Sequence, residues 1–155
     1  MTPVEYIHAD FTRKCYRALM NATQPQITDD LACVRDALER QPGIRQALVF
    51  GSMASGNAHA DSDLDIAVEM EHSMSVTDRM NLIETLATAT GRPIDLIDIK
   101  SAGEPLLGQI LEHGRRILGT NADYAALIRR HLFDAEDFLP YVERMVRERR
   151  QAWIG

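Results

Sequence analysis

Three short apolar segments constrain the fold of this 155-residue chain more than any other feature. Residues 44–50 end in a continuous apolar run, residues 64–70 alternate apolar with polar or small side chains, and residues 94–99 carry spaced isoleucine and leucine. Alternation with a period of two is typical of a half-buried β-strand. All three segments are therefore predicted to be strands. Because helical patterns separate them, the sequence predicts an α/β or α+β domain with a small sheet.

Helical patterns fill the chain between and around these strands. Ser75, followed three residues later by Asp78, predicts a capped helix N-terminus. The same helix is expected to turn Met80, Ile83 and Leu86 toward the core, since these positions share one helical face. Apolar residues at spacings of three and four predict helices over about 4–19, 28–38, 75–90, 106–112 and 121–150.

Length and composition favour one domain. The chain is 45% hydrophobic and 26% charged, which is ordinary globular usage, and a chain of this length can bury a core without disulfides or structural metal. We expect a single domain over residues 1–155, with its core over about 28–120 and an N-terminal helical extension over 1–26. C-terminal helices are expected over 121–155, where Pro140 should start a new helix or kink the existing one.

Charge and cysteine content exclude several classes of protein. The net charge of -6 argues against a general nucleic-acid binder, which needs a basic face for phosphates. The two cysteines form no C-x-x-C motif, and no apolar run approaches the ~20 residues that span a bilayer. We therefore expect a cytoplasmic protein with no membrane partner.

The segment from Gly51 to Asp65 carries the residues best suited to chemistry. Gly51 closes a predicted strand and lets the backbone approach a ligand, while Ser52 adds a hydroxyl where a helix could present N–H groups to an anion. Asp63 and Asp65 lie two apart at the start of a strand, so both carboxylates share one face. Asp95, on the matching face of the next strand, could supply a third. Such oxygen ligands suit Mg²⁺, and a metal site beside a phosphate cradle suits nucleotidyl transfer.

Two other interpretations of these acidic residues remain open. Asp98 could replace Asp95 as the third ligand, but strand alternation turns Asp98 to the opposite face and favours Asp95. The segment could also be an acidic turn that caps a helix. However, a Gly-Ser pair and an Asp-x-Asp at one fixed offset, flanked by strands, would rarely arise together by chance. This rarity disfavours the interpretation as a simple acidic turn.

These motifs resemble a known family. Residues 48–52 (Leu-Val-Phe-Gly-Ser) and 62–68 (Ser-Asp-Leu-Asp-Ile-Ala-Val) are similar to the signature of the DNA polymerase β-like nucleotidyltransferases, and more narrowly to that of the minimal nucleotidyltransferases (MNT). Residues 95–98 (Asp-Leu-Ile-Asp) resemble the later strand that carries the family's third carboxylate. The resemblance covers roughly residues 28–120 and implies a mixed sheet flanked by helices.

The resemblance also implies a reaction and a role for each motif residue. It implies transfer of AMP from ATP, with two Mg²⁺ ions and loss of pyrophosphate. Carried over position by position, Gly51 and Ser52 hold the triphosphate, and Asp63 and Asp65 ligate the metals. Asp95 completes the second metal site and acts as base.

The family further implies a protein partner. Many small bacterial MNT proteins are antitoxins that adenylylate a tyrosine of a paired HEPN-domain ribonuclease toxin, and this chain resembles them in size. Many members carry arginine where this chain has Met53 and Ser55, and losing two cations beside the triphosphate predicts weaker phosphate contacts. A catalytically weak antitoxin that acts by binding, and a small-molecule nucleotidyltransferase of the aminoglycoside-modifying type, are therefore the alternative hypotheses.

Overall fold

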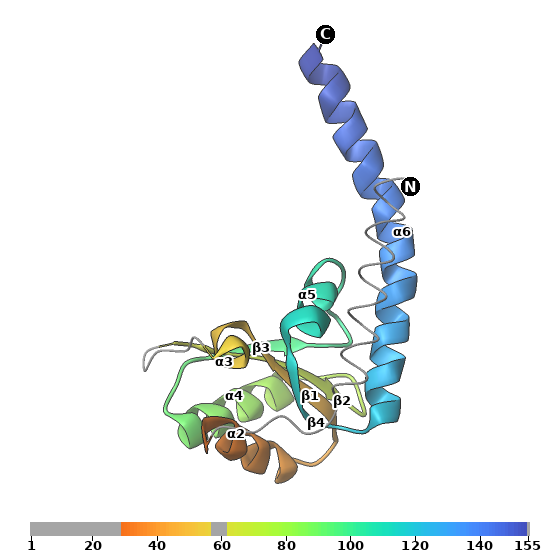
Figure 1. Cartoon of the computed structure of the whole chain (residues 1–155). Helices are drawn as coiled ribbons and strands as arrows, with labels where there is room; N and C mark the ends of the chain where they lie inside the picture. The colour runs from red at the N-terminus through yellow and green to blue at the C-terminus, as the bar shows by residue number, and fades with distance from the viewer. Residues whose placement is uncertain (1–28, 57–61, 155) are drawn as a thin grey trace.

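The computed structural model describes residues 29–56 and 62–154, and the predicted N-terminal helix over 4–19 lies outside them. Helices and strands alternate along the described chain (Figure 1). In order they are α2 (Asp29–Glu39), β1 (Ile44–Phe50), α3 (Gly51–Ser55), β2 (Leu64–Met70), α4 (Val76–Thr90), β3 (Ile94–Asp98), α5 (Leu106–His113), β4 (Arg115–Leu118) and α6 (Asn121–Ile154).

The sheet is mixed, as predicted, and its strands follow the order β3-β2-β1-β4. β1 runs antiparallel to both β2 and β4, whereas β2 and β3 run parallel. The expectation of three strands is wrong, because β4 forms a fourth at the edge beside β1. β4 has four residues, two of them arginines, so it is too short and too polar to give a readable alternation.

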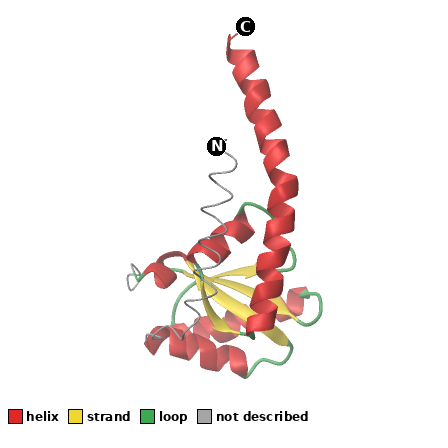
Figure 2. Cartoon of the chain, turned by 45° about the vertical axis from the view of Figure 1, so that its right-hand side comes forward, coloured by secondary structure: helices red, strands yellow, loops and turns green. Residues whose placement is uncertain are grey.

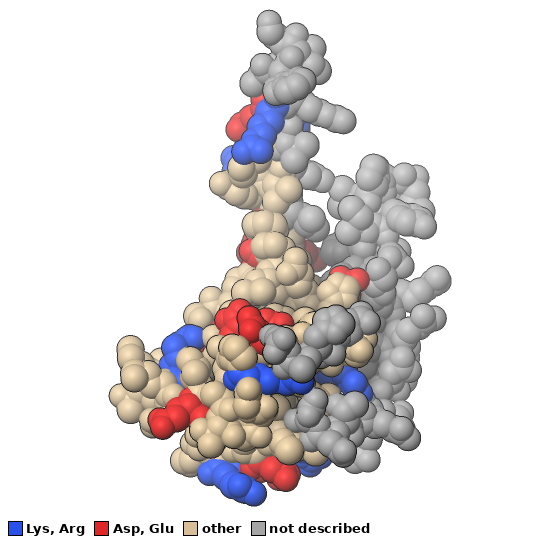
Figure 3. All heavy atoms as spheres, turned by 90° about the vertical axis from the view of Figure 1, so that its left-hand side faces the viewer, with Lys and Arg blue, Asp and Glu red and all other residues tan. Residues whose placement is uncertain are grey.

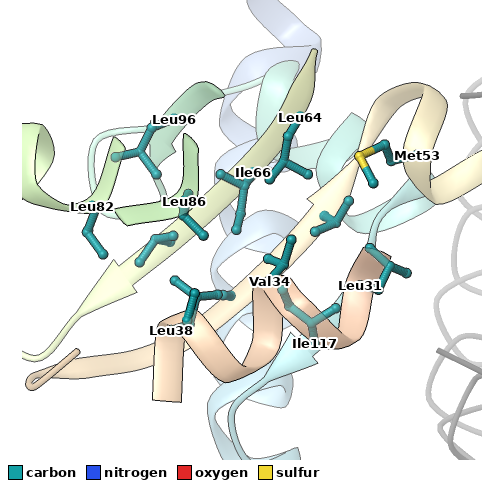
Figure 4. Packing of buried hydrophobic residues seen from close by; sticks show 14 of the residues in the cluster. Leu31, Val34, Leu38, Met53, Leu64, Ile66, Leu82, Leu86, Leu96 and Ile117 are labelled. Atoms are coloured by element: carbon teal, nitrogen blue, oxygen red, sulfur yellow. The ribbon is translucent and has the colours of Figure 1, made fainter. Parts of the chain in front are cut away.

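One face of the sheet is covered by α2 and α4. Side chains from these helices interlock with alternate residues of the strands to form the larger of the two cores (Figure 4). At roughly 25 cal/mol per Å² of apolar surface, burial of this kind is the main term that stabilises the domain. Its fully buried members include Leu31, Val34, Leu38, Val49, Leu64, Ile66, Val68 and Leu86.

The opposite face is covered by α5 and the first turns of α6 (Figure 2). Ala67 of β2 is completely buried in this second core, together with Leu107 and Ile110 of α5. The prediction that residues 64–70 form a half-buried strand is therefore wrong, since both faces of β2 are covered. The sequence did not indicate this second buried face, because the buried residue on it is a small alanine between two acidic positions, Asp65 and Glu69.

Helix α4 confirms one prediction and corrects another. Ser75 and Asp78 form a reciprocal capping box at its N-terminus, as the sequence predicts. Met80, however, is 65% exposed, and the buried side chains are Leu82 and Leu86. These two lie four residues apart on one helical face, and Met80 lies on another.

Helix α6 continues through Pro140 as one helix, so the expectation that this proline starts a new helix is wrong, and the alternative of a kink within one helix stays a prediction. Tyr124, Leu127, Ile128 and His131 in its first turns are buried, and the C-terminal part of the helix extends beyond the domain (Figure 1). A proline removes the hydrogen bond to the carbonyl four residues earlier, here that of Glu136. Both residues are exposed, so water can replace that bond. No helix of the described residues is long and apolar enough to cross a membrane.

Candidate active site

The motif residues meet at one edge of the sheet because of how three strands are paired. β1 ends where the antiparallel β2 begins, and Phe50 is the register partner of Asp65. β2 and β3 begin at the same edge, where Asp65 is paired with Asp95. Gly51, Asp65 and Asp95 therefore lie on three neighbouring strand ends, although 44 residues of sequence separate the first from the last.

Strand alternation settles which face these carboxylates occupy. Ala67 and Ile97 pack into the core beneath α5 and α6. Asp65 and Asp95 lie two residues before them and so occupy that same face. Asp98 lies on the other face by the same alternation, and its Oδ1 accepts a hydrogen bond from the backbone N–H of Lys100 at 3.0 Å. The structure thus brings Asp95 to Asp65, as the sequence predicts, and does not bring Asp98 there.

The electrostatics of the site centre on Asp65. Partial burial raises the pKa of Asp65 above its ordinary value, and the negative charges of Asp95 and Asp63 raise it further. A bound cation offsets the repulsion that neighbouring negative charges exert on such a carboxylate. These carboxylates therefore form a local concentration of negative charge that favours a divalent cation.

The donor set fits Mg²⁺ in the open form that this ion takes. Within residues 29–56 and 62–154, no group of three or more acidic, histidine or cysteine side chains is arranged so that it could hold a metal ion. Mg²⁺ usually binds through one or two carboxylates and completes its octahedron with water and substrate phosphates. The roles of Asp63, Asp65 and Asp95 as ligands remain predictions.

Gly51 is the residue that brings the backbone against the carboxylates. Its φ is +67°, a conformation that side chains disfavour, and a Cβ there would overlap Oδ2 of Asp65 and lie 2.9 Å from Cγ. Only glycine fits this position. Helix α3 starts here, and Ser52, half-exposed, follows directly after Gly51.

The two positions that depart from the family pattern have different surroundings. Met53 is only 7% exposed and belongs to the larger core, so this side chain is an apolar anchor for α3. Ser55 is exposed, and its hydroxyl donates to the carbonyl oxygen of Ser52 at 3.0 Å. In this chain Met53 therefore contributes apolar packing where many family members have a charged arginine.

A cavity of ≈ 650 Å³ opens beside Gly51, between α3 and α5. Phe50, Gly51 and Ser55 line one side of it. On the side of the molecule that carries α3 in Figure 1, acidic and basic surfaces lie next to each other (Figure 3). Sequence reasoning missed the α5 side of the cavity, because its residues carry no motif: Gln109, Glu112 and His113.

Sequence reasoning named Arg92 only as a cation that could compensate for the missing arginines, and it missed the contacts that this residue makes beside Asp63. Its Nη1 donates to the carbonyl oxygen of Ser62 at 3.1 Å, and the N–H of Leu64 donates to the carbonyl of Pro93 at 2.9 Å. These contacts hold the residues on both sides of Asp63. The Gly-Arg-Pro sequence predicts only the end of a helix, so no local signal announces this role.

Comparison with known proteins identifies the family to which this arrangement belongs. The family profile described as "Polymerase beta, Nucleotidyltransferase" matches residues 33–123. The chain belongs to the polymerase β nucleotidyltransferase family. This match confirms the family and the fold that the motifs imply.

Two further comparisons find proteins similar to this polymerase β nucleotidyltransferase. A "Protein adenylyltransferase MntA" from Shewanella oneidensis is 34% identical over 82 residues, which are 53% of this chain and 59% of that protein. A structure described as "Crystal structure of the toxin-antitoxin with AMP-PNP" aligns with a TM-score of 0.69 at 24% identity, covering 78% of this chain and 98% of that chain.

A third similarity is to one chain in a structure of a complex. That structure is described as a tri-AMPylated Shewanella oneidensis HEPN toxin in complex with an MNT antitoxin. It aligns with a TM-score of 0.64 at 21% identity, covering 77% of this chain and 94% of that chain. At these identities the two structures establish the fold of this nucleotidyltransferase.

Proposed function

We propose that this nucleotidyltransferase transfers AMP from ATP to a hydroxyl group of a partner protein, a HEPN-domain toxin, and acts as its antitoxin. The observation that carries the proposal is the junction of Gly51 with the paired carboxylates of Asp65 and Asp95. The similarity to a protein adenylyltransferase supports AMP as the transferred group. The similarity to a toxin–antitoxin complex containing an AMPylated HEPN toxin supports the class of partner.

Each site residue has a distinct part in the proposed reaction. Gly51 and Ser52 would position the triphosphate against the strand ends, and Asp63 and Asp65 would hold Mg²⁺. When bound, Mg²⁺ neutralises phosphate charge and lowers the barrier to attack on the α-phosphorus. Asp95 would complete the second metal site and accept the proton of the acceptor hydroxyl.

The proposed transfer balances without any further reactant. The acceptor oxygen forms a bond to the α-phosphorus while the bond from that phosphorus to the bridging oxygen of pyrophosphate breaks. Pyrophosphate leaves with the electron pair of that bond, and the proton of the hydroxyl passes to a carboxylate of the site. A tyrosine hydroxyl suits this role, because its pKa near 10 makes it more easily deprotonated than an aliphatic hydroxyl.

The proposal is tested by incubating the protein with α-labelled ATP, Mg²⁺ and the product of the adjacent gene, which the proposal expects to be a HEPN protein. Label should enter the HEPN protein, and a phosphodiesterase that cleaves the bond between tyrosine and AMP should remove it. Asp63→Asn and Asp65→Asn should each abolish labelling while leaving the circular-dichroism spectrum unchanged. Asp98→Asn is the matched control, because Asp98 lies on the other face, and it should label normally. No label in the wild-type reaction would sink the proposal.

A second function is favoured by one observation. Met53 is buried in the core, and Ser55 carries no charge, so neither position offers a cation to the triphosphate. A site with weak phosphate contacts would suit an antitoxin that neutralises its partner by binding. The double variant Asp63→Ala/Asp65→Ala distinguishes the two functions: full protection of cells from the toxin by this variant would favour binding alone.

A further inference from the structure

The cavity between α3 and α5 has two walls of different chemistry. Phe50, Gly51 and Ser55 form the wall that belongs to the family motif, and the exposed side of α5 forms the other. At ≈ 650 Å³ the cavity falls within the roughly 300–1,000 Å³ of pockets that bind small molecules. The α5 wall lies outside every motif of the sequence.

We propose that this cavity receives the nucleoside of the nucleotide, and that Gln109 and Glu112 on α5 select adenine. The inference rests on the proposed function and extends it to the choice of base. The nucleoside is joined directly to the α-phosphate, so it must lie in a hollow that opens beside the carboxylates. Gly51 borders both places, since it lines the cavity and its Cα faces Asp65.

Helix α5, which forms the second wall of the cavity, is anchored in the core by its apolar face. Leu107, Ile110 and Leu111 on one side of this helix are almost completely buried in the core beneath it. Gln109 and Glu112, on the other side, are exposed to the cavity. A rigid helix with its apolar face anchored can hold polar groups in fixed positions, which is what selection of a base requires.

The polar groups of this wall match adenine. The side-chain amide of Gln109 offers one acceptor and donors, which is the complement of the N6 amino group and N7 of adenine. The carboxylate of Glu112 only accepts hydrogen bonds when ionised. On the base edge that carries N7 and the 6-substituent, it therefore favours the amino group of adenine over the O6 oxygen of guanine. Glu112 lies 3.8 Å from Nε2 of His113, which places that ring at the same wall. Phe50 offers an aromatic face at the opposite wall.

The first experiment separates the nucleoside from the phosphates. Gln109→Trp places a large ring in the cavity, and binding is measured by calorimetry with Mg²⁺ and two ligands, AMP-PNP and inorganic tripolyphosphate. We expect the dissociation constant of AMP-PNP to rise roughly tenfold or more and that of tripolyphosphate to stay unchanged. Asn81→Trp, an equally exposed position on α4 across the sheet, is the matched control and should change neither.

The second experiment tests the choice of base. The wild-type protein should bind AMP-PNP more tightly than the corresponding guanosine analogue. Glu112→Gln restores a donor that guanine O6 can use, so the ratio of the two affinities should fall by about tenfold. An unchanged ratio in Glu112→Gln would overturn the assignment of Glu112.

Three other outcomes of the binding experiment would overturn either the inference or the proposed function. If Gln109→Trp binds AMP-PNP normally but labels the HEPN protein poorly, the cavity takes the acceptor and the inference is overturned. Equal weakening of AMP-PNP and tripolyphosphate would mean that the substitution disturbs the phosphate site, and would also overturn it. If the wild-type protein binds neither ligand, the proposed function itself fails, which is a different result.

Discussion

Gly51 and Asp65 lie so close that no side chain fits between them: a Cβ on Gly51 would overlap Oδ2 of Asp65. This contact joins the end of β1 to the start of β2 at the position where Phe50 and Asp65 are register partners. The backbone at Gly51, where phosphate binding is predicted, is therefore in direct contact with the Asp65 carboxylate. Displacing either residue displaces the other.

Gly51→Ala should accordingly abolish nucleotide binding. The added methyl group pushes the Asp65 carboxylate out of place, and the positive φ costs about 1–2 kcal/mol in addition. Gly91→Ala is the matched control, because Gly91 has the same φ of +67° with nothing within 4 Å. Both variants should lose thermal stability, and only Gly51→Ala should lose binding of AMP-PNP with Mg²⁺. Equal binding by the two variants would contradict the proposed role of this contact.

Arg92→Ala should reduce transfer more than it reduces stability. The guanidinium holds the carbonyl of Ser62 and thereby the backbone that leads into Asp63. A displacement of about 1 Å at a catalytic group can cost up to ~10²-fold in rate, so we expect a loss of about ten- to a hundredfold. The measurement compares labelling rates with thermal unfolding.

Arg35→Ala is the control for Arg92→Ala. Arg35 lies on α2, where its Nε pairs with Glu39 on the helix surface at 2.8 Å. An exposed pair of this kind contributes little to stability. Transfer by Arg35→Ala should therefore match that of the wild type. A similar loss in both variants would show that Arg92 has no specific positioning role.

Asp78 should make the stability of the domain depend on acid pH. Hydrogen bonds from the Ser75 side chain and backbone hold the pKa of Asp78 below its ordinary value. A lowered pKa stabilises the fold above the unfolded value near 3.9, and that contribution is lost as the pH falls through the folded value. Asp78→Asn should therefore unfold at lower urea than the wild type at pH 7, and the difference should shrink below about pH 4.

The control for this titration is Asp36→Asn, which removes one negative charge from an exposed position on α2. It should leave the urea midpoint at pH 7 nearly unchanged. If Asp78→Asn and the wild type differed by the same amount at pH 7 and pH 3, the capping carboxylate would not be the source of the pH dependence.

The pair formed by His131 and Glu104 should tie α6 to the start of α5. Nδ1 of His131 is hydrogen-bonded to Oε1 of Glu104, and their side chains are only 5% and 7% exposed. His131→Leu removes this partner from a buried carboxyl group and should cost about 1–3 kcal/mol of unfolding free energy. The double variant with Glu104→Leu should recover much of that loss, because no polar group is then left buried. Strictly additive losses in chemical denaturation would refute this coupling.

The sequence alone determined the parts of this protein that depend on neighbours along the chain. A continuous apolar run located β1, period-two alternation located β2, and spaced isoleucine and leucine located β3. The Ser75–Asp78 spacing located the start of α4. The fixed offset between Gly51-Ser52 and Asp63-x-Asp65 pointed to the family and to the edge of the sheet that carries the candidate site. Alternation also separated Asp95 from Asp98. All of these signals are local, since they follow from the geometry of a single strand or helix turn.

Only the tertiary structure decided the features that require distant segments to meet. The edge strand β4 exists because β1 offers it a partner, and the second buried face of β2 exists because α5 and α6 cover Ala67. The link from Arg92 to Ser62 spans 30 residues, and the cavity joins α3 to α5 across more than 50. Such contacts produce no periodic pattern in the sequence, because they depend on how the sheet and helices pack and not on neighbouring residues along the chain.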